Sequence, residues 1–180
     1  MEVNDKDTFL NNEVWVLTFG AAFQRANIYN KTATQAQKKK FKNELRFYIE
    51  KLVLEEYHKE GITDEAHINN INSIVNYTIN YNKENDILSN GKLNFGVSQK
   101  LLNLYLKYKW CLKEIPTPPH FPVDRRIQSI LKMKKIASWT QMGDSKEYEK
   151  IIAAVRDLAK TEELSAAHYE LKYFQRSQNY

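Results

Sequence analysis

Lys100 and Asp124 are the two side chains whose types and positions could together perform covalent chemistry. Lys100 comes four residues after Gly96, which we expect to open a helix. The positive end of the helix dipole lies there, so an amine near it has a lowered pKa and is a better nucleophile. Asp124 stands directly before an apolar helical stretch, where a carboxylate can cap the helix and still act on a substrate. The simpler alternatives are a solvated surface lysine and an aspartate that serves only as a cap.

The residues around this pair carry an excess of positive charge. Residues 91–135 hold ten Lys or Arg and only two acids, a net charge of +8, whereas the remaining 135 residues have a net charge of −3. Such a local excess indicates an anion-binding face, with a surface that serves only solubility as the alternative. The backbone N–H groups at a helix start also attract phosphate. The sequence therefore predicts an anion-binding surface, and its candidate contacts to the phosphates of a nucleic acid are Gly96, Ser98, Gln99, Lys92, Lys107, His120, Arg125 and Arg126.

Composition excludes several other kinds of site. The chain has 180 residues and one cysteine, Cys111, so it has neither an internal disulfide nor a cysteine-based zinc site. The four histidines are scattered, with no pair at the spacing of metal ligands, and we expect neither a metal nor a cofactor. No apolar run approaches the roughly 18 residues of a membrane span, and the polar, acidic start is unlike a signal peptide. We therefore expect a cytoplasmic protein that does not enter membranes.

Hydrophobic periodicity predicts that helices alone position this pair. All four prolines fall between Pro116 and Pro122, where they stiffen the segment before Asp124. No stretch of useful length alternates with the period of a strand. The expected helices cover 12–29, 34–59 (ended by Gly61), Thr63 or Asp64 to 79, 96–113, 124–133, Asp144 or Ser145 to 160, and 162–175. The sequence predicts an all-α protein, a compact bundle of seven to eight helices. It forms a single domain over residues 1–180, divided if at all into two lobes by a cleft near residues 95–126.

Residues 93–131 carry a pattern with some specificity. They contain Gly-Val-x-x-Lys at a helix start, then a helix, a proline-containing loop and Pro-Val-Asp-x-x-Ile. This pattern resembles the helix-hairpin-helix DNA glycosylase superfamily, and it is most similar to the branch that excises oxidised guanine. The resemblance implies that Lys100 forms a Schiff base with the sugar C1′ and that Asp124 stabilises the charge that develops on the sugar. It also implies that Gly96 and Val97 form the hairpin turn that holds the DNA backbone.

The same resemblance implies a glycosylase-like helical fold, DNA as the partner, and base excision with AP-lyase cleavage that needs no cofactor. Residues 166–174 loosely resemble the closing helix of that family. Aromatic residues could line the pocket for a flipped base, and the candidates are Phe95, Trp110, Phe121 and Trp139. A second hypothesis keeps the scaffold without catalysis, as a helical module that binds nucleic acid or a nucleotide. A third is an all-helical interaction protein in which the proline segment is only a rigid connection.

Overall fold

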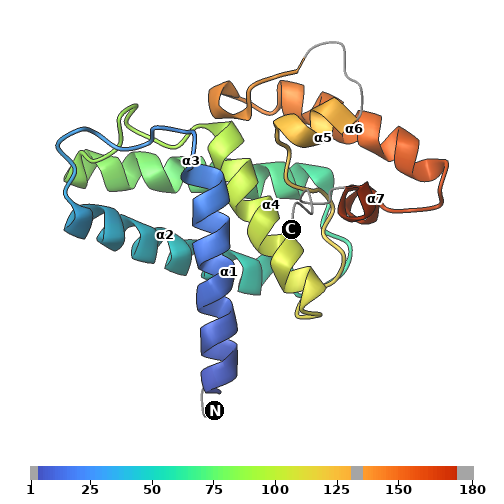
Figure 1. Ribbon diagram of the computed structural model, residues 1–180, viewed down its shortest axis with the longest axis horizontal. Helices are drawn as coiled ribbons and strands as arrows, with labels where there is room; N and C mark the ends of the chain where they lie inside the picture. Colours follow the sequence, from blue (N-terminus) through green and yellow to red (C-terminus); the bar gives the residue numbers. More distant parts are fainter. Residues whose placement is uncertain (1–3, 131–135, 174–180) are drawn as a thin grey trace, which may run out of the picture.

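Helices account for the regular structure of the computed structural model, which describes residues 4–130 and 136–173 (Figure 1). These ranges contain α1 (Asp5–Phe23), α2 (Gln35–Glu56), α3 (Asp64–Asn85), α4 (Phe95–Cys111), α5 (Arg125–Ile130), a 3-10 helix η1 (Trp139–Gln141), α6 (Lys146–Lys160) and α7 (Ala166–Tyr173). In the same ranges, β-type pairing is limited to one isolated bridge between Tyr29 and Leu88. None of these helices is long and apolar enough to span a bilayer. The prediction of an all-α chain with seven to eight helices is confirmed.

Polar side chains fix the starts of several helices. Thr63, one of the two predicted candidates, accepts a hydrogen bond from the backbone N–H of Ala66 at the start of α3. Thr34 forms a capping box with Gln37 at the start of α2. Asn94 caps α4 by accepting a hydrogen bond from the backbone N–H of Val97. Each cap satisfies a backbone N–H group that the helix itself leaves without a partner.

The helix ends differ from the predicted ranges by four or more residues in four places, one of which is α3: it ends at Asn85, six residues after the predicted end at residue 79. α1 begins seven residues before the predicted start, because Asn4 caps it and its first turns are exposed and so carry no apolar periodicity. It stops well before residue 29, because Asn27 has a positive φ of 45° that a continuing helix excludes. α7 begins four residues later than predicted, after Glu163 with a φ of 55°. The predicted extensions to Met133 and Gln175 lie outside the described residues.

α4 is the central helix of the fold. Its stretch Phe95–Leu106 is buried except at Leu104. α1 packs along one side of α4 and α3 along another, while α2 packs against α3 (Figure 1). η1 covers the start of α4, and α6 and α7 pack against each other. Because nearly every side of this stretch faces protein, most of its polar side chains are enclosed by other residues.

The contact between η1 and α4 depends on Gly96. A Cβ atom at this position would lie 1.7 Å from the carbonyl oxygen of Trp139, so no larger residue fits. The N–H of Gly96 donates to the carbonyl of Met142 at 3.0 Å, and the N–H of Val97 donates to the side chain of Asn94 at 2.9 Å. Gly96 and Val97 therefore lie inside α4 with their amides already bonded. This corrects the prediction that they form a turn open to DNA phosphates.

Candidate functional site

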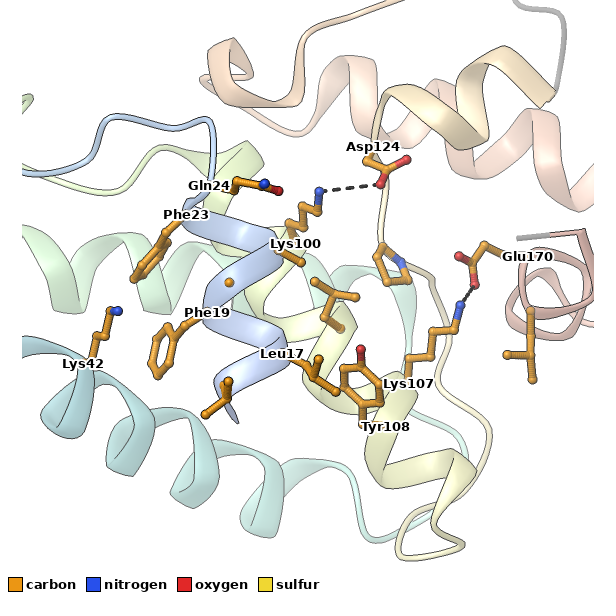
Figure 2. A pocket seen from close by; sticks show the side chains of 16 residues that line it. Leu17, Phe19, Phe23, Gln24, Lys42, Lys100, Lys107, Tyr108, Asp124 and Glu170 are labelled. Atoms are coloured by element: carbon orange, nitrogen blue, oxygen red, sulfur yellow. Dashed lines mark hydrogen bonds and ion pairs between the residues drawn. The ribbon is translucent and has the colours of Figure 1, made fainter. Parts of the chain in front are cut away.

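Lys100 and Lys107 lie on the same side of α4, because seven residues span two helical turns. Both amines reach a groove bounded by α1, α4, the segment before α5, and α7 (Figure 2). Each meets one carboxylate there. Lys100 Nζ lies 3.5 Å from Asp124 Oδ2, and Lys107 Nζ lies 2.7 Å from Glu170 Oε2. The two residues singled out for chemistry, Lys100 and Asp124, are therefore neighbours in space although 24 positions separate them.

Gln99 holds the segment that carries Asp124. Its side-chain N–H₂ donates to the carbonyl of Val123 at 2.7 Å, and its side-chain oxygen accepts from the N–H of Val123 at 3.1 Å. Both bonds are buried, so the backbone directly before Asp124 is fixed to α4. The carboxylate then uses its two oxygens differently. Oδ1 accepts from two N–H groups in the first turn of α5, and Oδ2 faces Lys100. Asp124 is both a helix cap and the partner of the amine.

The amine of Lys100 lies in a largely enclosed position. The side chain is only 9% exposed, and Nζ lies 4.2 Å from the centre of the Trp139 ring. Burial lowers the pKa of Lys100, Asp124 opposes that change, and the nearby charge of Arg25 adds to it. The pKa of Lys100 is lowered on balance. At neutral pH a larger share of this amine is therefore uncharged and nucleophilic than in an ordinary lysine.

Two cavities meet at the pair of Lys100 and Asp124. The larger has a volume of about 980 Å³ and a mostly apolar wall, to which Phe19, Phe23 and Leu104 contribute. The smaller has a volume of about 410 Å³ and a polar wall that includes arginine side chains. Lys100 and Asp124 line both of them. Small-molecule sites commonly have volumes of about 300–1,000 Å³, so the larger cavity is roomy enough for a nucleobase with its sugar.

The second pair, Lys107 with Glu170, lines the α7 side of the larger cavity (Figure 2). The side chain of Glu170 is 2% exposed. Burial raises the pKa of Glu170, and Lys107 acts in the opposite direction without cancelling the effect. A buried carboxylate of this kind needs its cation, because removing one partner of a buried ion pair leaves an uncompensated charge. This pair therefore ties α7 to α4 and closes one wall of the cavity.

The other predicted nucleic-acid contacts divide into exposed and buried residues. Lys92, Arg125 and Arg126 are exposed. Ser98 and Gln99 are fully buried inside α4. Buried groups whose neighbours are protein cannot touch a nucleic-acid backbone, so the predicted contacts at Ser98 and Gln99 do not fit this structure.

His120 is also buried, within a chain of polar contacts. Its Nδ1 lies 2.8 Å from the hydroxyl of Tyr148, and its Nε2 lies 3.1 Å from Asp64 Oδ1. The same hydroxyl lies 3.4 Å from Nε2 of His67, and Arg156 pairs with the carboxylate of Asp64. Burial lowers the pKa of His120 to about 4, so the ring is neutral at neutral pH. The predicted role of His120 as a contact to phosphate is corrected to a structural one.

Sequence reasoning missed three residues of the groove: Gln24, Arg25 and Glu170. Gln24 and Arg25 follow the end of α1, and no motif there links them to Lys100. The sequence did contain an indication that Glu170 is buried, because it lies one helical turn after Ala166 and Ala167, on the same side of α7. An acid on an apolar helix face indicates either a buried partner or a site.

Comparison with known proteins yields no relative: no family model, no curated protein and no solved structure matches this chain. Across residues 4–130 and 136–173, no group of three or more His, Cys, Asp or Glu is placed to hold a metal ion. The groove brings together side chains that could act in a reaction. They supply an amine with a lowered pKa, a carboxylate 3.5 Å away, and a cavity on either side.

Proposed function

We propose that this protein is a DNA-processing enzyme of the base-excision type, a DNA glycosylase with AP-lyase activity in which Lys100 forms the Schiff base. The observation that carries the proposal is the convergence of Lys100 and Asp124 on the wall of a cavity that fits a nucleoside. A lysine that served only as a surface charge would point to open solvent. Lys100 instead has a lowered pKa and a carboxylate partner, which are the properties of an amine nucleophile.

In this reaction the neutral amine of Lys100 attacks C1′ of the deoxyribose. A C–N bond forms as the glycosidic bond breaks, and the base leaves with the bonding electron pair and is then protonated. Asp124 is placed to stabilise the positive charge that develops on the sugar and to accept the proton that the amine nitrogen loses. Opening of the sugar ring then gives the protonated Schiff base. The mostly apolar wall of the larger cavity suits a base that has left the helical stack.

Borohydride trapping tests this proposal directly. The protein is incubated with duplexes that contain an abasic site, an oxidised guanine or a modified pyrimidine, and reduction fixes any Schiff base as a covalent adduct. Lys100→Arg and Lys107→Arg form a matched pair, because both keep a positive charge in the same cavity and both remove a primary amine. We expect an adduct with the wild-type protein and with Lys107→Arg, and none with Lys100→Arg. An adduct that persists in Lys100→Arg would exclude Lys100 as the nucleophile.

Asp124→Asn separates the two functions of the carboxylate. An asparagine side chain still caps α5, so the fold should be kept, but it carries no negative charge beside the amine. We expect an adduct that forms at least about a hundredfold more slowly, the lower end of the range for loss of one acid–base group. If the wild-type protein forms no adduct on any substrate but still binds DNA in a salt-sensitive manner, the non-catalytic nucleic-acid-binding module replaces the enzyme as the conclusion.

A further inference from the structure

The smaller cavity beside Lys100 collects positive charge from two separate elements. Arg25 follows the end of α1, and Arg125 and Arg126 open α5. Together with Lys100 they place four basic side chains on its wall, against a single acid, Asp124. The oxygens of that acid already face Lys100 and two backbone N–H groups. Asp124 therefore does not neutralise the charges of Arg25 and Arg125 on this wall.

Helix energetics do not account for these arginines. Cations in the first turn of a helix oppose its dipole, so Arg125 and Arg126 are placed where a positive charge is unfavourable. Neither Arg25 nor Arg125 forms an ion pair with an acid in the described part of the chain, and both are exposed. Arg25 is also close enough for its charge to lower the pKa of Lys100. Like charges gathered around one cavity repel each other, and a bound anion relieves that repulsion.

The two cavities have a common boundary. Ala21, Gln24, Lys100 and Asp124 line both of them, so the reactive pair separates a mostly apolar space from a basic one. A nucleotide within a nucleic-acid strand has the same order of parts: an aromatic base, a sugar, and a charged phosphodiester. If the sugar lies at Lys100 and the base in the larger cavity, the phosphodiester next to that sugar reaches the smaller one.

We propose that the smaller cavity binds a phosphodiester that flanks the reacting nucleotide, with Arg25 as a principal ligand. This inference rests on the function proposed above and adds to it the place where the substrate backbone is held, the wall of the smaller cavity at Arg25. Arginine suits the role because its planar guanidinium can donate two parallel hydrogen bonds to phosphate oxygens. Lys100 and Arg25 then act on adjacent parts of one nucleotide, the sugar and its phosphate.

A binding measurement that needs no chemistry tests the phosphate site. The probes are three duplexes with one tetrahydrofuran abasic-site analogue, which cannot form a Schiff base. One has natural linkages, one has a neutral methylphosphonate on the 5′ side of the analogue, and one has it on the 3′ side. Affinities are measured at one fixed salt concentration for wild type, Arg25→Gln and Lys59→Gln. Lys59 is an exposed cation beyond the end of α2, so its variant controls for the loss of one positive charge.

We expect one of the two methylphosphonates to weaken wild-type binding by about tenfold, the lower end for a hydrogen bond between charged groups. The same methylphosphonate should weaken binding to Arg25→Gln by less than about twofold, because the arginine and the phosphate act as a pair. Lys59→Gln should behave as the wild type. If each methylphosphonate weakens binding to Arg25→Gln by the same factor as binding to the wild type, Arg25 does not act on either phosphate and the phosphate site is overturned. The site is also overturned if the wild type binds none of the three duplexes.

The outcomes separate this inference from the proposed function. Borohydride adducts with abasic DNA, together with independent effects of Arg25 and phosphate, would leave the lyase standing and remove the phosphate site. Coupling between Arg25 and one phosphate, without any adduct, would keep the phosphate site and remove the lyase. In that case the groove would be a nucleic-acid-binding site of a non-catalytic module.

Discussion

Replacing Gly96 with alanine tests whether the Lys100 site depends on the close contact between η1 and α4. A Cβ atom at residue 96 would lie 1.7 Å from the carbonyl oxygen of Trp139 and 2.8 Å from its carbonyl carbon. Contacts shorter than 3.0 Å are essentially never seen for Cβ, so the shortfall to the oxygen is 1.3 Å. The obstacle is backbone, which cannot rotate away as the end of a side chain can. Trp139 must therefore retreat from α4.

Two effects of opposite sign determine how far Gly96→Ala changes the free energy of unfolding. Alanine is the better helix former, and this alone would stabilise the protein by about 1 kcal/mol. Moving η1 away from α4 lowers the free energy of unfolding by roughly 1–3 kcal/mol or more because of overpacking. Loss of the hydrogen bond from the N–H of Gly96 to the carbonyl of Met142 lowers it by about 1 kcal/mol more. We expect a net decrease of about 3 kcal/mol in the free energy of unfolding, because a clash with backbone belongs at the upper end of the overpacking range.

The assay is urea unfolding followed by far-ultraviolet circular dichroism. Gly20→Ala is the matched control, because Gly20 lies inside α1 and a Cβ there meets nothing within 4 Å. Gly20→Ala should gain about 1 kcal/mol, as expected for this change in a helix. Gly96→Ala should in addition slow Schiff-base trapping, since Trp139 lies against the amine of Lys100. Unchanged or increased stability of Gly96→Ala would refute the reasoning about this contact.

Three further changes test the supports of the groove. Gln99→Leu leaves both backbone groups of Val123 without their partners and should cost about 2–4 kcal/mol in urea unfolding; a loss below about 1 kcal/mol would contradict the role of Gln99. Lys107→Met should cost about 3 kcal/mol at pH 7 by stranding the buried carboxylate of Glu170, and less at pH 4, where that carboxyl is protonated; a pH-independent loss would contradict it. Lowering the pH from 7 to 4.5 should cost the wild type about 2 kcal/mol through His120, because the unfolded ring binds a proton near pH 6.5 and the folded ring only near 4. His120→Gln should show a smaller loss over the same pH range.

The helices could be predicted because they are amphipathic and capped by recognisable residues. α3 has apolar residues at helical intervals and a threonine in front of them, so both its type and its start could be inferred. The N-terminal part of α1 could not be predicted, since Phe9 and Leu10 are exposed there and the helix has no buried face in that part. The irregular segments after α1 and before α7 contain Asn27 and Glu163, whose positive φ values are incompatible with an α-helix. Apolar periodicity gives no sign of such a backbone conformation, so these helix ends could not be predicted.

The pairing of Lys100 with Asp124 could be expected from the resemblance of residues 93–131 to a glycosylase pattern, but the surroundings of the pair could not be inferred. Gln99 is polar and lies in the first turns of a helix, which by itself indicates an exposed residue. It is buried because its partner, Val123, is 24 positions away and both of that residue's backbone groups face it. Asn103 is buried for a similar reason, since it donates to the hydroxyl of Tyr148. Polar residues whose partners are distant in sequence leave no local pattern to detect.

The contact between Trp139 and Lys100 also gives the protein an optical indicator. Indole fluorescence is sensitive to a charge near the ring, and Nζ of Lys100 lies 4.2 Å from the centre of the Trp139 ring. Loss of the proton changes that charge and should shift the emission wavelength of Trp139. The other two tryptophans also lie beside titratable groups: Trp15 donates its N–H to Glu50, and Trp110 lies against His168. Their contribution to the change in emission is measured by the same titration in the Lys100→Arg variant and is then subtracted. The state of the amine can thus be followed during a reaction without any added label.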